Sequence, residues 1–229
     1  VLPIVSGTAW YIILVTLMIY WQAKDRPIYP SMEPGQSIAY ISDIGAGQLK
    51  PLFVLCAALT TISFNASIVA ETWLRHWGGL EHNYTQVERR LSITSIVFGA
   101  LAGYGLVCLS IFDTQAYPRV HNLCLFTFMG TFVASAVCNC WEHGILASRG
   151  QEYRTYRHTF WMKLFFILLE LGLASAFVAT WHTHYYNAAA ALEWNLAIIF
   201  GIHLFTYAID LLPDRHSPTQ LCKSKLEDI

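Results

Sequence analysis

The sequence predicts an all-α membrane protein: a single bundle of six transmembrane helices with a long first extracytoplasmic loop. Hydrophobic residues make up 55% of the chain and charged residues 13%, whereas soluble domains carry about 25% charged residues. The hydrophobic residues gather into six stretches of about 20 residues, the length that crosses a bilayer. Because a backbone in hydrocarbon must satisfy its own hydrogen bonds, each stretch is expected to be a helix.

The first three spans occupy the N-terminal half of the chain. They cover residues 2–21, 51–73 and 93–112. No basic region or small-residue cleavage site accompanies the first, which predicts a retained anchor rather than a cleaved signal peptide. Trp21 and Trp73 end the first two spans, as expected for aromatic rings in the headgroup layer.

The last three spans follow after short polar loops. They cover residues 122–141, 160–181 and 192–212, and residues 213–229 form a tail. Tryptophans again stand at the span ends, at Trp141, Trp161, Trp181 and Trp194. Six spans use about half the chain, so we expect one domain over residues 1–229.

The distribution of Lys and Arg predicts the orientation of the bundle. The loops after spans two and four, the start of span five and the tail hold most of these residues: Arg75, Arg89, Arg90, Arg149, Arg154, Arg157, Lys163, Arg215, Lys223 and Lys225. The opposite side holds Lys24, Arg26, Lys50 and Arg119. We therefore expect both termini in the cytoplasm and the first loop, residues 22–50, outside.

The first loop is the longest outer segment. Residues 38–41 read as a short β-like patch, and Asp43 follows it in a position to accept backbone N–H groups of a turn. Gly45 and Gly47 permit a tight backbone. Two interpretations stay open, a self-stabilising turn leading into the second span and a lid over the outer mouth of the bundle.

Motifs along nearly the whole chain resemble those of the Frag/DRAM/Sfk family of six-span proteins. They are Tyr40-Ile41-Ser42-Asp43-Ile44-Gly45-Ala46, Lys50-Pro51-Leu52-Phe53, Trp73-Leu74-Arg75-His76, Leu109-Ser110-Ile111-Phe112-Asp113-Thr114, Val120-His121, Leu192-Glu193-Trp194 and Asp210-Leu211-Leu212-Pro213. The individual residues of these motifs are most similar to those of the fungal Sfk branch, the suppressors of a phosphatidylinositol 4-kinase defect.

The resemblance implies a plasma-membrane protein that supports phosphatidylinositol 4-kinase recruitment, phosphoinositide homeostasis, lipid asymmetry and sterol retention. Its implied partners are membrane lipids, phospholipid or sterol, and a lipid-kinase complex at the cytoplasmic face. The animal DRAM branch acts in autophagy and lysosomes, and a third branch remodels the lipid of GPI anchors. An endolysosomal, vacuolar, Golgi or ER membrane is therefore the alternative location.

Two ionisable residues lie near the middle of neighbouring spans, Glu170 in the fifth and His203 in the sixth. The two spans are antiparallel, and counting from their outer ends places both residues at similar depth. A charge at mid-bilayer is costly, so we predict a hydrogen bond or ion pair between them. It would serve as interhelical glue, or as a proton relay or lipid-headgroup contact.

Polar residues also gather at the outer face. The predicted headgroup-binding set is Tyr40, Ser42, Asp43, Asp113, His121, Glu193 and Trp194. Such groups could also build a metal site or an acid–base pair. Since the chain has no HExxH motif and these groups sit at the wet boundary, we predict no metal, no cofactor and no catalytic residue.

A basic set at the cytoplasmic face predicts docking to anionic lipid or to a kinase complex. It consists of Arg75, Arg149, Arg154 and Arg157. The alternative interpretation is the ordinary excess of Lys and Arg on the cytoplasmic side of membrane proteins. Arg75 also stands four residues after Glu71, a spacing that favours a salt bridge within a helix. The net charge of −1 gives no basic surface for nucleic acid.

Three functions compete. The first is a non-enzymatic regulator or scaffold that binds lipids and helps to recruit a lipid kinase, favoured by the resemblance and by the lack of a nucleophile–base motif. The second is a lipid-remodelling enzyme at the outer face that uses His121 with Asp113 or Glu193. The third is a lipid transporter or scramblase, for which the polar groups within the spans are sparse.

Overall fold

The computed structural model describes residues 1–76, 85–149 and 154–211. Within them it has one short and six long helices and no strand, which confirms the predicted fold class. Their bounds are α1 Leu2–Ala23, α2 Ile41–Gly45, α3 Lys50–His76, α4 Gln86–Ile111, α5 Pro118–Ala147, α6 Arg154–His182 and α7 Tyr186–Asp210. All six long helices are long and apolar enough to cross a membrane.

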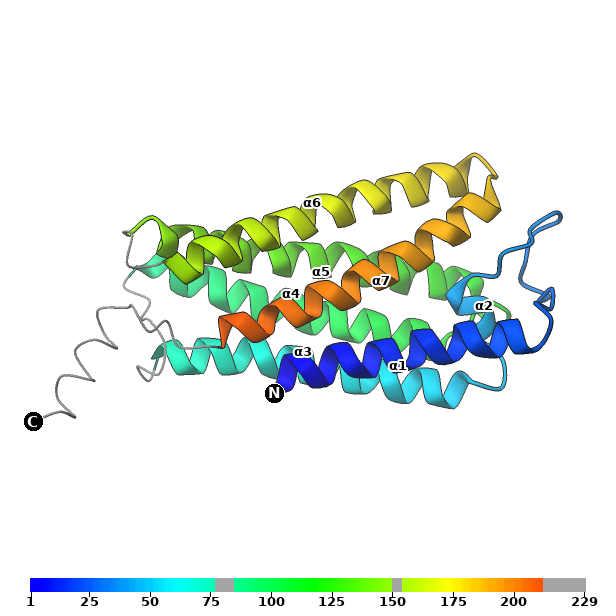
Figure 1. Cartoon of the computed structure of the whole chain (residues 1–229), viewed down its shortest axis with the longest axis horizontal. Helices are drawn as coiled ribbons and strands as arrows, with labels where there is room; N and C mark the ends of the chain where they lie inside the picture. Colours follow the sequence, from blue (N-terminus) through cyan, green and yellow to red (C-terminus); the bar gives the residue numbers. More distant parts are fainter. Residues whose placement is uncertain (77–84, 150–153, 212–229) are drawn as a thin grey trace, which may run out of the picture.

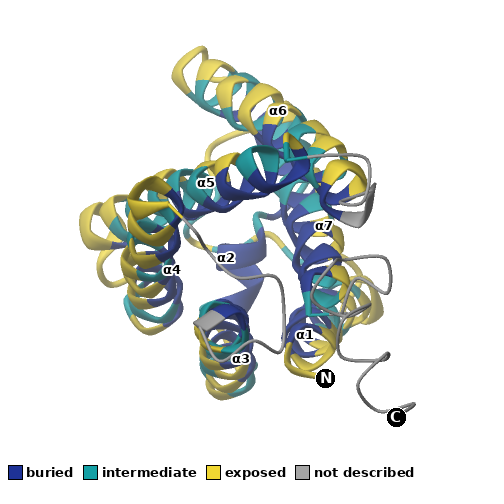
Figure 2. Ribbon diagram, turned by 90° about the vertical axis from the view of Figure 1, so that its left-hand side faces the viewer, coloured by how far each residue is buried: buried dark blue, intermediate teal, exposed yellow. Residues whose placement is uncertain are grey.

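The six long helices form a ring. Its order is α1, α3, α4, α5, α6 and α7, and α7 packs back on α1 (Figure 2). The short helix α2 lies at one end of the bundle, next to α1 and α7 (Figure 1). We call this the α2 end, and the opposite end, where α1 begins and α7 finishes, the termini end.

Two helices, α4 and α5, begin before the predicted apolar spans because residues that favour a helix start stand there. In α4 the Thr85 hydroxyl accepts the N–H of Glu88 at 3.3 Å, and the Glu88 carboxylate accepts the N–H of Thr85 at 3.3 Å. This capping box starts the helix seven residues before the predicted apolar boundary. Pro118, in the first turn of α5, likewise starts that helix before the predicted span of residues 122–141.

The first outer loop contains a short helix, Ile41–Gly45, and no strand where the sequence predicted a β-like patch over residues 38–41. The Asp43 carboxylate accepts the N–H of Tyr40 at 3.0 Å, which caps the first turn of α2. Trp194 in α7 donates its indole N–H to the carbonyl of Ala39 at 3.0 Å. The bond from Trp194 holds the loop against the mouth of the ring.

The long helices present apolar side chains outward as well as inward, as a membrane requires. Ile12, Ile62, Val97, Leu123 and Leu168 are exposed although they are large and apolar. Inside the ring, an aromatic and aliphatic core lies between the helices, and the burial colours follow the same division (Figure 2). The surface of the ring that points outward therefore suits contact with lipid, and the surface that points inward suits packing between helices.

Candidate functional site

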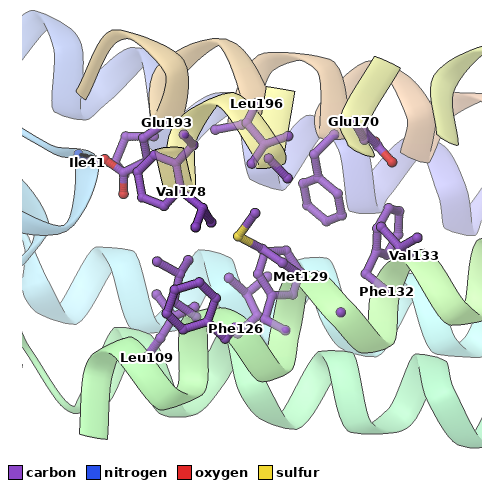
Figure 3. Close-up of a pocket in the computed structure, with 18 of the residues that line it drawn as sticks. Ile41, Leu109, Phe126, Met129, Phe132, Val133, Glu170, Val178, Glu193 and Leu196 are labelled. Atoms are coloured by element: carbon purple, nitrogen blue, oxygen red, sulfur yellow. Dashed lines mark hydrogen bonds between the residues drawn. The ribbon is translucent and has the colours of Figure 1, made fainter. Parts of the chain in front are cut away.

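A large cavity lies inside the half of the bundle nearer to α2. Its volume is about 720 Å³, and α5, α6 and α7 supply most of its wall. The wall is almost wholly apolar, with Met129, Val178 and Leu196 at its centre (Figure 3). Among the described residues, its acidic side chains are Glu193 and Glu170, which stand at opposite ends in this view. An apolar cavity of this size fits part of a lipid.

The cavity opens sideways between α5 and α6. Its exposed wall residues belong to these two helices: Phe126, Gly130, Leu171, Ser175 and Ala179. Wall residues from α1, α2, α3 and α4, in contrast, are buried. A molecule in the bilayer therefore has a path into the cavity from the membrane side.

A second, polar pocket adjoins the apolar cavity at the α2 end. Its volume is about 170 Å³. Both walls share Ser42, Leu125, Phe126, Phe177 and Glu193. The two spaces together have the layout of an amphiphile, with a polar part near the α2 end and an apolar part within the bundle.

The Glu193 carboxylate links α7 to α2 and faces both spaces. Its Oε2 accepts the backbone N–H of Ile41 at 2.9 Å, and the side chain remains half-buried. Asp43, by comparison, is buried, and its Oδ1 accepts the Ser31 hydroxyl at 2.6 Å. Burial raises the pKa of the Asp43 carboxyl above its ordinary value, and the hydrogen bonds from Ser31 and Tyr40 oppose this rise.

The imidazole of His121 has a fixed orientation in the wall of the polar pocket. Its Nδ1 lies 3.0 Å from the carbonyl of Leu109 and 2.8 Å from that of Phe112. Because both partners only accept, we assign the ring proton to Nδ1. A neutral His121 then offers Nε2 as a hydrogen-bond acceptor.

The structure brings five of the seven predicted headgroup residues into the wall of the polar pocket: Tyr40, Ser42, Asp43, His121 and Glu193. Asp113 does not line it, because its Oδ2 is bonded to the Lys50 ammonium at 2.6 Å. Trp194 is buried and serves to hold the loop at Ala39.

Sequence reasoning missed most of the apolar wall, above all Gly130, Ser175 and the aromatic Phe126. Apolar residues in a span show no signal of a cavity, because the same residues fill a packed core. A small residue in each of two neighbouring spans is the one available hint, and many such residues serve only close packing.

Glu170 and His203 lie within hydrogen-bond distance, as predicted. His203 Nδ1 is 3.0 Å from Glu170 Oε1, and both side chains are buried. The second carboxylate oxygen, Oε2, has no hydrogen-bond partner among the described residues. This oxygen belongs to a residue of the cavity wall, so the pair joins α6 to α7 and also leaves one acceptor for an occupant.

A buried ionic cluster fills the termini end of the ring. Its members are Glu71, Arg75, Glu142, His143, Lys163 and Asp210. Arg75 lies 2.7 Å from Glu71 and 3.7 Å from Glu142, and Lys163 is bonded to Asp210 and Asn139. The cluster connects α3, α5, α6 and α7 at this end of the ring.

The predicted cytoplasmic docking residues have different environments. Arg75 is 1% exposed, so its side chain does not reach the surface, which corrects its place in the docking set. Arg149 is bonded to Glu88 at 2.5 Å, and Arg157 is exposed. The side chain of Arg154 lies outside the part that the structure describes.

Three members of the ionic cluster also have a geometry that a metal ion could use. Ligand atoms of Glu71, His143 and Asp210 lie within 4.8 Å of one another. The positive charges of Arg75 and Lys163 already neutralise the carboxylates of Glu71 and Asp210, respectively. The sequence missed this group because its members come from three helices and form no motif.

Comparison with known proteins shows similarity along nearly the entire chain. The family model of the Frag1/DRAM/Sfk1/Cwh43P N-terminal domain matches residues 1–213. Protein SFK1 of Saccharomyces cerevisiae is 24% identical, over 92% of this chain and 77% of that protein. Protein sfk1 of Schizosaccharomyces pombe is 28% identical, over 92% of this chain and 63% of that protein. No solved structure matches.

Proposed function

Because the chain belongs to the Frag1/DRAM/Sfk1/Cwh43P family, we propose that it is a non-enzymatic, lipid-binding membrane regulator of the Sfk type. In this proposal it resides in the plasma membrane and supports phosphatidylinositol 4-kinase recruitment, phosphoinositide supply and lipid asymmetry.

The observation that carries the proposal is the apolar cavity with its opening between α5 and α6. Water-soluble substrates would reach a site through an aqueous mouth, whereas the exposed wall residues at this opening lie on α5 and α6, two helices long and apolar enough to cross a membrane. An occupant would gain stability by transferring its chain to a wall of matched polarity and shape. Binding of membrane lipid therefore accounts for the cavity without any chemistry.

The termini end is assigned to the cytoplasm by the excess of Lys and Arg there. Exposed Arg157 near the start of α6, together with Arg154 at its first position and Arg149 just after α5, forms the docking face for anionic lipid or a kinase complex. Each basic residue near an anionic leaflet contributes about 1 kcal/mol of attraction. Arg75 contributes indirectly, by stabilising the ends of the helices that carry this face.

A lipid-remodelling enzyme is the second candidate, and one observation favours it. The orientation of His121 by two backbone carbonyls leaves Nε2 as a base beside Asp43 and Glu193 in one pocket. Turnover of an added phospholipid or GPI lipid by the purified protein, lost in His121→Ala, would establish this candidate instead. The third candidate, a scramblase, has less support, because the cavity wall is nearly all apolar.

A bulky residue at the opening tests the proposal. A Cβ at Gly130 would meet no atom within 4 Å, and Gly130 is part of the cavity wall. We expect Gly130→Trp to fold normally, to lose lipid from the purified protein several-fold, and to lower phosphatidylinositol 4-phosphate in cells. Mass spectrometry of the co-purified lipid and a phosphoinositide assay provide the two measurements.

Gly172→Trp is the matched control. Gly172 lies on α6, a Cβ there also meets nothing within 4 Å, and it is not part of the cavity wall. Its lipid content and phosphoinositide level should equal those of the wild type. Unchanged lipid in Gly130→Trp would remove the support for cavity binding, while lost lipid with unchanged phosphoinositide would remove the link to the kinase.

A further inference from the structure

We propose that the polar pocket binds the positively charged amine of an amphiphile whose chain lies in the apolar cavity. Among the described residues, the pocket wall has three carboxylates and neither Lys nor Arg; the carboxylates are Glu33, Asp43 and Glu193. This inference rests on the proposed function, because it names the class of lipid that the same cavity takes.

The charges at the pocket favour a cation over an anion. Glu33 is exposed and Glu193 is half-buried, so both carboxylates can face a ligand. Lys50 starts α3 at the same end of the bundle, but its ammonium is bonded to Asp113 at 2.6 Å. The ring proton of His121 is directed to two backbone carbonyls. A phosphate would therefore meet carboxylates without a basic partner, whereas an ammonium would meet its counter-ions.

The remaining wall also suits an ammonium group. Five aromatic rings line the pocket: Tyr40, Phe126, Phe177, Trp181 and Tyr186. Aromatic faces attract cations, and they do so most strongly where water is excluded. The hydroxyl oxygen of Tyr40 is buried and has no hydrogen-bond partner among the described residues, so it is a further acceptor for an amine N–H.

One molecule can occupy both spaces because their walls are continuous. Glu193 lines both, beside Ile41 at one end of the cavity (Figure 3). An amine at Glu193 places an attached chain among Met129, Val178 and Leu196, with the opening between α5 and α6 for any second chain. Diacyl and single-chain amphiphiles both fit this arrangement.

Glu170 is the competing position for an amine within the cavity. It is 3% exposed, and its Oε2 has no hydrogen-bond partner among the described residues. However, its Oε1 is already bonded to His203, and the surrounding wall is apolar. Desolvation of an ammonium costs less in the polar pocket, where several acceptors replace water, so Glu193 is the favoured partner.

Binding of matched amphiphiles to the purified full chain tests the inference. Dodecylamine and dodecyltrimethylammonium are compared with dodecanoate, dodecyl phosphate and dodecanol. We expect the two cations to bind about tenfold more tightly than the other three compounds, because hydrogen bonds and contacts that involve a charged group are stronger than those between neutral groups. Lysophosphatidylethanolamine and lysophosphatidylcholine, each compared with lysophosphatidylglycerol, then distinguish a primary amine from a quaternary ammonium.

Glu193→Gln should remove the preference for cations while retaining binding of dodecanol. The amide oxygen of the glutamine can still accept the N–H of Ile41, so the mutant is expected to fold. Glu170→Gln changes the competing position and should keep the preference for cations. Loss of the preference in Glu170→Gln but not in Glu193→Gln would overturn the assigned position.

Two other outcomes separate this inference from the function on which it rests. Equal binding of all five amphiphiles, or tighter binding of the anions, would overturn the amine assignment and leave lipid binding intact. If none of the five binds and Gly130→Trp keeps its lipid, the proposed function fails as well.

Discussion

The outer carboxyl groups differ in the partners that surround them, and these partners set their roles. Asp43 is buried and accepts hydrogen bonds from Ser31 and Tyr40, so it builds the turn that carries α2. Asp113 lies between α4 and α5 and is bonded to Lys50, so it holds this connection to α3. Hydrogen bonding to Lys50 keeps the pKa of Asp113 below its ordinary value, whereas burial raises that of Asp43.

At the residue scale, Asp113→Asn is expected to lower the thermal stability wherever the pH is above the ordinary pKa of the carboxyl group, neutral pH included. Asp113 Oδ1 also accepts the N–H groups of Gln115 and Ala116, and an asparagine can keep these bonds while it loses the ion pair. Because the folded-state pKa is lowered, the stabilisation is complete above the unfolded value of 3.8 and disappears as the pH falls through the folded value. We expect the Tm in detergent to fall by about 1–2 °C at pH 7.

The pH dependence supplies the check on this prediction. The difference in Tm between wild type and Asp113→Asn should shrink when thermal unfolding is measured below pH 4. A difference that is constant from pH 7 to pH 3 would mean that the mutation acts through the turn and not through the charge.

At the scale of the helices, glycines decide how closely α4 and α5 approach. A Cβ at Gly105 would lie 2.8 Å from the backbone N and 3.0 Å from the Cα of Phe128. Backbone atoms cannot move aside as a flexible side chain can, so the two helices would have to separate. Gly99 and Gly103, the GxxxG pair of the same helix, serve packing on Asn65 of α3 in a similar way.

Gly105→Ala should therefore destabilise the bundle by about 1–3 kcal/mol, the usual cost of overpacking. Gly172→Ala, at a position where the new Cβ meets nothing within 4 Å, should be neutral or stabilising by up to about 1 kcal/mol. Thermal unfolding of both variants in detergent gives the comparison. Equal stability of the two would show that the α4–α5 contact tolerates an added methyl group.

At the scale of the whole molecule, the two ends of the ring have opposite character. The α2 end contains the apolar cavity and the polar pocket, and the termini end contains the buried ionic cluster. Buried ion pairs contribute little net stability, but removal of one partner is costly, so such a cluster fixes the relative positions of its helices.

The orientation of the bundle is open to a labelling test. Glu33 at the α2 end and Arg89 at the termini end are both exposed. An impermeant thiol reagent applied to intact cells should label Glu33→Cys, and it should label Arg89→Cys only after the cells are permeabilised. The unmodified chain gives the background from its own cysteines. The reverse pattern would invert the orientation and would place the polar pocket in the cytoplasm.

The sequence by itself determined the six long helices and the residue types at their two ends. Long apolar stretches specify helices whatever their neighbours, because a backbone in lipid must satisfy its hydrogen bonds locally. The similar depth of Glu170 and His203 followed from the regular rise of a helix. The residue types alone showed that Tyr40, Asp43, His121 and Glu193 are polar groups near the same end.

Only the tertiary structure decided which of these residues share a site. Asp113 and Trp194 lie at a depth similar to that of the polar-pocket residues. However, Asp113 is bonded to Lys50 and Trp194 to Ala39, and neither lines the pocket. Arg75 reads as a surface charge and is buried, because carboxylates from α3 and α5 meet it inside the ring. A cavity depends on how apolar side chains of several helices fail to fill the space between them, and no local pattern in the sequence records that.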